Sequence, residues 1–184
     1  MMFGKNRGIR ELGKWIPAGS VGVEIGVWRG DGSEILLQRA GFLHMVDPWA
    51  VDAYAGPNEF GGFDAYLQRY SELVGSSDPA DFQRYYDQVY REVVARFQGR
   101  PVAIHRQNSR EFFASFHSMV DWVYIDGSHE EKTVLQDIVD ASAIVYDSVM
   151  GDDYGVKPGV TAAVNKAASG RCLELFNRGQ WRIS

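Results

Sequence analysis

Two glycines and a glutamate stand close together near the N-terminus, in the run EIGVWRG at residues 24–30. Gly26 and Gly30 allow a tight turn with positive φ and the close approach of a ligand to the backbone. A dinucleotide-binding loop has the spacing G-x-G-x-x-G, with a glycine where this chain has Glu24. A carboxylate there would repel a pyrophosphate but could help to hold a cationic amino group. The spacing therefore favours a zwitterionic ligand over NAD.

A second carboxylate, Asp47, ends the apolar run FLHMVD at residues 42–47. A carboxylate that follows the second strand of a nucleotide-binding unit can accept hydrogen bonds from both hydroxyls of a ribose. Trp28 and Trp49 lie beside these residues and could pack on an adenosine, although packing in the core is the more usual role of such rings. The pattern predicts a nucleoside site built around Asp47.

Two acidic clusters occur later in the chain, Asp126 in the run DGSH and the pair Asp152 and Asp153. Carboxylates that converge repel one another unless a proton or a cation lies between them, and a hard divalent ion such as Mg²⁺ prefers such oxygen ligands. Helix capping or a solvated turn would explain the same residues. Both interpretations stay open at this point.

The elements that position these residues alternate between short β-rich runs and helical stretches, which predicts an α/β fold with a parallel sheet. Strands are expected at residues 21–26, 42–47, 101–106, 120–126 and 146–151, with a closing antiparallel hairpin at 172–176 and 180–183. Helices are expected at residues 9–16, 31–40, 64–73, 81–97, 109–116, 130–143 and 161–168. Because ligands of open α/β sheets bind beyond the carboxyl ends of the strands, this order predicts that the glycine loop and the acidic residues share one edge.

The length of 184 residues predicts a single domain over residues 1–184. Segment 49–100 is longer than a crossover between neighbouring strands requires, and it combines turn signals at 55–63 with a helical pattern at 81–97. We expect this segment to form a helical insertion that covers the site as a lid or wall.

The composition of the chain limits the classes of partner and the cellular location that we expect for the protein. The net charge is -5, from 19 basic and 24 acidic residues, whereas proteins that wrap nucleic acid usually carry a basic excess, so no nucleic-acid partner is expected. Cys172 is the only cysteine, which excludes an intrachain disulfide and fits a reducing cytoplasm. The sequence shows neither a signal peptide nor the roughly 18 apolar residues of a membrane span. We therefore expect a cytoplasmic protein without a membrane partner, and nothing excludes a homo-oligomer.

The glycine loop, Asp47, the strand order and the closing hairpin together resemble the class I S-adenosylmethionine-dependent methyltransferases, over residues 21–183. The resemblance implies a Rossmann-like three-layer sandwich with a mostly parallel sheet of about seven strands. In that family the glycine loop cradles the methionine part of S-adenosylmethionine, the acid after strand two binds the ribose, and the segment after strand three contacts the adenine. The predicted cofactor-binding residues are Glu24, Gly26, Trp28, Gly30, Asp47, Asn108, Ser109 and Asp126.

The acceptor side resembles the metal-dependent O-methyltransferases of the catechol and macrocin type. In that group an Asp after strand four and an acid pair after strand five hold magnesium, and a base lies three residues beyond the first Asp. The resemblance implies Asp126, Asp152 and Asp153 as metal ligands, with His129 and Asp126 as the catalytic residues. An imidazole with an ordinary pKa of about 6.5 could accept a hydroxyl proton near neutral pH. The Pro-Gly-Gly turn usual before strand five is replaced here by IVYDS at 144–148.

Our first hypothesis is therefore methyl transfer from S-adenosylmethionine to a hydroxyl of a small-molecule acceptor, such as a sugar or a phenol. The alternative within the fold is an N-methyltransferase or protein methyltransferase. The Asn/Asp-Pro-Pro-Tyr run of enzymes that methylate base amino groups is absent. A domain that binds S-adenosylmethionine without catalysis is the alternative from another class. Dependence on a divalent ion separates the first two, and any turnover separates both from the third.

Overall fold

The computed structural model describes residues 9–11, 13–56 and 58–184. The predicted first helix at 9–16 falls partly outside them: residues 9–11 are helical, Gly13–Trp15 form a 3-10 turn (η1), and Leu12 lies outside the described residues. The N-terminal residues 1–8, in which no signal peptide was predicted, also lie outside the described residues.

Seven strands form one sheet in the order β3-β2-β1-β4-β5-β7-β6. The first five strands pair in parallel, whereas β7 runs antiparallel to both β5 and β6. The strands are β1 Val21–Ile25, β2 Phe42–Asp47, β3 Val102–Arg106, β4 Val120–Ile125, β5 Val145–Gly151, β6 Leu173–Leu175 and β7 Trp181–Ile183. The predicted Rossmann-like sheet with an antiparallel C-terminal hairpin is confirmed.

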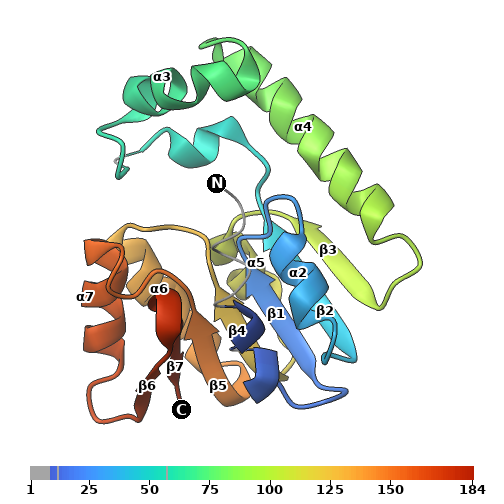
Figure 1. Ribbon diagram of the computed structural model, residues 1–184, viewed down its shortest axis with the longest axis vertical. Coiled ribbons are helices and arrows are strands. Elements are labelled where there is room, and N and C mark those ends of the chain that lie inside the picture. The colour runs from blue at the N-terminus through green and yellow to red at the C-terminus, as the bar shows by residue number, and fades with distance from the viewer. Residues whose placement is uncertain (1–8, 12, 57) are drawn as a thin grey trace.

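Helices cover both faces of the sheet (Figure 1). Their bounds are α2 Asp31–Leu36, α3 Phe63–Val74, α4 Pro79–Arg96, α5 Ser109–Ser115, α6 Glu131–Ser142 and α7 Pro158–Ala167, with 3-10 turns η2 Val51–Tyr54 and η3 Asn177–Gly179. One apolar cluster joins α2, α4 and the N-terminal segment to one face, and another joins α5, α6 and α7 to the opposite face. No helix in the described part of the chain has the length and apolar character needed to cross a membrane.

The central strand β1 shows how the pleat positions a polar residue. Val23 and Ile25 point into the cluster under α5, α6 and α7, as the alternation of a strand requires. The side chain of Trp122 from β4 occupies the space beside Gly22, which therefore has no room for a Cβ atom. Glu24 consequently points to the α2 face, where it is 2% exposed.

Helix α2 ends at Leu36, earlier than the predicted Ala40. Turns follow, in which the Gly19 N–H donates to the Arg39 carbonyl and the Gly41 N–H donates to the Ser20 carbonyl. These bonds replace helical ones because the chain must reverse within a few residues to start β2. Local helix propensity is overridden by the position of the next strand.

Segment 49–100 contains η2, α3 and α4 and lies across the edge to which the parallel strands point (Figure 1). One face of α4 packs into the main core through Tyr86, Val89 and Val93. The rest of the segment packs on itself in a small cluster around Tyr66, Leu67 and Phe82. The segment is therefore anchored to the domain along α4, while η2 and α3 extend over the strand ends.

Candidate active site

The glycine loop after β1 has the backbone that its spacing predicted. Gly26 has φ 91° and Gly30 has φ 80°, values in the left-handed region that favours glycine. A Cβ atom at Gly26 would collide with the backbone of Asp126, and one at Gly30 would approach the Phe97 ring to 2.5 Å. The loop is thus pressed against the end of β4 on one side and the end of α4 on the other.

Asp47 holds this loop through its carboxylate. Its Oδ2 atom accepts hydrogen bonds from the Val27 N–H at 3.0 Å and the Trp28 N–H at 2.9 Å, and Oδ1 accepts one from the Trp49 N–H at 2.8 Å. Burial raises the pKa of Asp47, and these three backbone donors oppose the rise. Asp47 lies where a ribose contact was predicted, and it also has a structural role that the sequence did not indicate.

The two tryptophans beside the loop have unusual backbones, with φ 53° at Trp28 and φ 41° at Trp49. Such conformations cost about 1–3 kcal/mol for non-glycine residues and persist only where the surroundings impose them. The Trp49 Nε1–H donates to the Trp28 carbonyl at 2.8 Å, and the Trp49 ring is fully buried. The Trp28 ring is 38% exposed and packs against Tyr85 and Tyr86 of α4. Trp28 is thus the point where the glycine loop meets segment 49–100.

Glu24 is a buried acid below the loop. Its carboxyl accepts a hydrogen bond from the Ser33 hydroxyl of α2. Burial raises the pKa of Glu24 to about 8, the Ser33 bond opposes this, and the negative charges of Asp126 and Asp47 add to it. Glu24 is therefore mostly protonated at neutral pH, and a nearby cationic group would favour its ionised form.

Asn108 and Ser109 follow β3 at the expected edge, and both make contacts within the protein. Asn108 caps α5: its Oδ1 accepts from the Glu111 N–H at 2.9 Å, and the Glu111 carboxylate accepts from the Asn108 N–H at 3.1 Å. Ser109 donates a hydrogen bond to the buried Asp137 of α6, whose pKa burial raises to about 7 against the opposing effect of this bond. These contacts position the start of α5 beside the strand ends.

On the acceptor side, His129 lies between two carboxylates. Its Nε2 atom is 2.8 Å from Oδ2 of Asp153, and its Nδ1 atom contacts Glu59 of segment 49–100. The Lys157 Nζ atom also contacts Glu59, at 2.5 Å from Oε2. The hydrogen bond to Asp153 and then that to Glu59 raise the pKa of His129, although burial opposes the rise. The imidazole therefore favours its charged form in this arrangement.

The predicted magnesium site is not formed by the described residues, among which no three His, Cys, Asp or Glu side chains are grouped to hold a metal ion. Asp153 has φ 67° and directs its carboxylate to His129. Asp152 is 7% exposed, and its Oδ1 accepts from the Asp153 N–H at 2.7 Å. In the acid pair after β5, Asp152 thus contacts the backbone of Asp153, and Asp153 contacts His129.

Glu59 contacts His129 and Lys157 without any motif in the sequence that would indicate it. Glu59 lies in a loop without a motif, and its contacts join residues separated by 70 and 98 positions. Only the unexpected length of segment 49–100 indicated that something from this region would reach the site. A pair formed by His44 of β2 and His105 of β3 was likewise not predicted; its ring nitrogens are 3.0 Å apart on the α5 face.

Solved structures of other proteins share this fold at low sequence identity. SMU.1697c of Streptococcus mutans, named as a methyltransferase and solved with S-adenosylhomocysteine (SAH), aligns with a TM-score of 0.59 and 9% identity, over 100% of this chain and 97% of that chain. The O-methyltransferase NovP aligns with a TM-score of 0.55 and 17% identity, over 98% of this chain and 79% of that chain. A ribosomal protein L11 methylase of Lactobacillus delbrueckii subsp. bulgaricus aligns with a TM-score of 0.56 and 14% identity, over 99% of this chain and 80% of that chain. The last two names indicate different acceptors, and likeness at such low identity shows the fold alone.

No curated protein sequence matches the chain. A family described as a methyltransferase domain matches residues 23–153, which extend from β1 to the acid pair after β5 and so include the glycine loop, Asp47 and His129. The match covers well over half of the chain and both halves of the candidate site. The chain therefore belongs to the methyltransferase-domain family and is an S-adenosylmethionine-dependent methyltransferase.

Proposed function

We propose that the protein transfers the methyl group of S-adenosylmethionine to a hydroxyl group of a small molecule, with His129 as the base. The observation that carries this proposal is the 2.8 Å contact between His129 Nε2 and Asp153 Oδ2. A carboxylate on one ring nitrogen fixes the orientation of an imidazole and leaves the other nitrogen to exchange a proton. The second nitrogen, Nδ1, faces Glu59. When the acceptor hydroxyl takes the place of Glu59, one of the two carboxylates that favour the charged ring is removed, and the neutral imidazole can accept a proton at Nδ1.

The cofactor contacts in this proposal remain those predicted from the sequence. Glu24 would balance the amino group of the methionine part, which supports its ionised form, and Asp47 would accept from the ribose while holding the loop. In the transfer the acceptor oxygen forms a bond to the methyl carbon while the sulfur–methyl bond breaks and its electron pair stays on sulfur. The hydroxyl proton goes to His129 Nδ1, and most of the rate gain comes from positioning.

The position of segment 49–100 favours a small acceptor. The segment contacts the cofactor loop through Trp28 and reaches the acceptor side through Glu59, so it spans the edge where the strands end. An acceptor has to fit beneath it, and the net charge of -5 gives no attraction for nucleic acid. We propose that this segment is the cover of a single-domain enzyme.

A magnesium-assisted reaction is the second candidate, favoured by the three carboxylates at the ends of β4 and β5. It would require Asp126, Asp152 and Asp153 to turn toward a common point. Transfer that is abolished by a chelator and restored by Mg²⁺ would support this candidate, and transfer that a chelator leaves unchanged would support the route through His129 alone.

Calorimetric titration with S-adenosylmethionine and SAH tests the cofactor half of the proposal. We expect micromolar binding that Asp47→Ala abolishes and that the exposed control Asp64→Ala preserves. Folded protein that binds neither ligand would refute the assignment.

A screen that follows a labelled methyl group into paired hydroxyl and amine compounds tests the acceptor half. We expect hydroxyl compounds to be methylated and His129→Gln to lower the transfer rate at least about a hundredfold, as removal of a general base does. Methylation of the amine members alone would favour an N-methyltransferase.

A further inference from the structure

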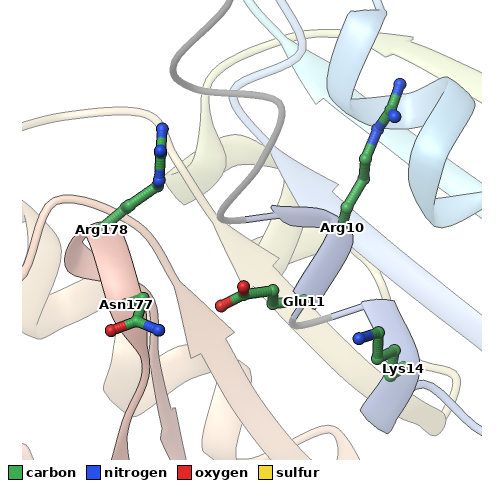
Figure 2. A pocket seen from close by; sticks show the side chains of 5 residues that line it. All are labelled: Arg10, Glu11, Lys14, Asn177 and Arg178. Atoms are coloured by element: carbon green, nitrogen blue, oxygen red, sulfur yellow. The ribbon is translucent and has the colours of Figure 1, made fainter.

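A cavity of about 600 Å³ lies between the two ends of the chain. One wall comes from the N-terminal helical turns and the other from η3, so residues far apart in sequence face each other (Figure 2). Small-molecule sites commonly have volumes of about 300–1,000 Å³. The lining residues are Arg10, Glu11, Lys14, Asn177 and Arg178.

Both walls are attached to the candidate active site. On the N-terminal side, Ile9 is buried, and its Cδ1 atom lies 3.2 Å from where a Cβ of Gly32 would be, next to the Glu24 carboxylate. On the η3 side, the Gly179 carbonyl accepts a hydrogen bond at 2.8 Å from the Tyr154 N–H, one residue after Asp153. One wall of the cavity is therefore connected to the Glu24 region of the candidate site, and the other wall is connected to the Asp153 region.

The lining is positively charged, with three cations and one carboxylate in a chain whose net charge is -5. No hydrogen bond or ion pair joins Arg10 or Lys14 to another residue that the structure describes, whereas Arg96 and Arg106 each contact an acidic side chain. Arg10 and Arg178 extend in the same direction from opposite walls (Figure 2). A positively charged lining attracts an anion, and a guanidinium group can hold a carboxylate or a phosphate through paired hydrogen bonds.

The backbone beneath Arg178 is held in place. Arg178 has φ 68° and ψ 33°, a left-handed conformation that costs free energy in a non-glycine residue. It precedes Gly179, which packs against Asp153, and Gln180, which is 1% exposed and accepts a hydrogen bond from the Tyr124 hydroxyl at 3.1 Å. Backbone strain that neighbours impose in this way occurs mainly at functional sites.

We propose that this cavity binds an anionic group, a carboxylate or a phosphate, of the methyl acceptor. The acceptor is then a small hydroxylated acid or phosphate ester, held by Arg10 and Arg178 with its hydroxyl directed to His129. The identification of the anion with the acceptor rests on the proposed function, whereas the binding of an anion here does not.

Calorimetry with matched pairs of probes tests the proposal on SAH-saturated protein. The pairs are 4-hydroxybenzoate with 4-hydroxybenzyl alcohol, and glucose 6-phosphate with glucose, so that each arm isolates one kind of anion. In at least one pair, we expect the anionic member to bind about tenfold or more tightly than the neutral one. Arg10→Gln and Arg178→Gln should each weaken that binding about tenfold, which corresponds to about 1.4 kcal/mol. The control Arg69→Gln, at an exposed position on α3, should leave it unchanged.

Binding of SAH, measured on the same samples, distinguishes a failure of the anion site from a failure of the proposed function. SAH binding with no preference for either anion, or a preference that both arginine variants retain, would overturn the inference and leave the proposed function standing. An anion preference lost in the arginine variants of a protein that does not bind SAH would support the anion site and refute the proposed function. Circular dichroism of each variant verifies that the fold is retained.

Discussion

The candidate site has two halves that are stabilised by different interactions. We call the glycine loop with Asp47 the cofactor half, and the region around His129 and Glu59 the acceptor half. On the cofactor side, Asp47 accepts three backbone hydrogen bonds and the glycines are in close contact with neighbouring elements. On the acceptor side, Glu59 meets His129 and Lys157 through side chains that are 22–32% exposed and come from separate segments.

This difference indicates which half can change shape. Loss of a backbone hydrogen bond to a half-buried carboxylate leaves a polar group unpaired wherever water cannot reach it, which costs about 1–3 kcal/mol for each group. Partly exposed ion pairs contribute about 0–1 kcal/mol each and are weakened by salt. We therefore expect a rigid cofactor half and an acceptor half in which segment 49–100 can open.

The strongest test of the rigid half is Gly26→Ala, which we expect to lower the free energy of unfolding by about 4 kcal/mol, from positive φ together with a collision against the Asp126 backbone. The matched control is Gly155→Ala, because Gly155 has φ 75° but open space around it, and it should cost only about 1 kcal/mol. Urea unfolding measures both. Equal losses would mean that the loop is not tightly packed against β4.

Asp47→Ala should lower the free energy of unfolding by about 3 kcal/mol, since it leaves the N–H groups of Val27, Trp28 and Trp49 without their acceptor. Removal of a carboxylate whose pKa desolvation raises offsets part of this loss. We also expect faster amide hydrogen exchange across the glycine loop. Unchanged exchange there would contradict the claim that Asp47 fixes the loop.

Glu24→Gln should have the opposite effect on stability: we expect it to raise the free energy of unfolding of the ligand-free protein by about 2 kcal/mol at pH 8. The pKa of Glu24 is raised from 4.5 to about 8, so the folded protein holds this proton more tightly than the unfolded chain. Its contribution to stability therefore falls as the pH rises from about 4.5 past 8, and Gln removes that fall. Thermal unfolding between pH 5 and pH 9 measures the difference. A variant with the same pH profile as the parent would refute the buried-acid assignment.

The smallest effect is expected for Glu59→Gln, which removes two ion pairs and should change the free energy of unfolding by less than about 1 kcal/mol. Hydrogen exchange at residues 55–63 should nevertheless become several-fold faster, and 0.5 M salt should produce a similar increase in the parent protein. Glu72→Gln, on α3 of the same segment, is the matched control and should change neither. Slow, salt-independent exchange in Glu59→Gln would mean that the acceptor half is as rigid as the cofactor half.

The sequence by itself determined the backbone of the glycine loop and the edge at which Asp47 lies, because both depend on patterns within short stretches of the chain. The glycine spacing specifies a turn with positive φ, and the alternation of apolar runs specifies the strand order that places Asp47 and Asp126 at one edge. Most element boundaries agree with the prediction within three residues, and the early end of α2 reflects a chain reversal that helix propensity does not encode.

Only the tertiary structure decided the acceptor half. Three features join segments that are distant in the chain: the contact of Glu59 with His129, the contact of His129 with Asp153, and the position of Arg10 opposite Arg178 across a cavity. The path of each loop sets these contacts, and side-chain periodicity carries no information about such a path. Local physics therefore specified the glycine loop and the position of Asp47, whereas the long-range packing of segment 49–100 and the position of the N-terminal helical turns opposite η3 determined the surroundings of His129 and of the cavity.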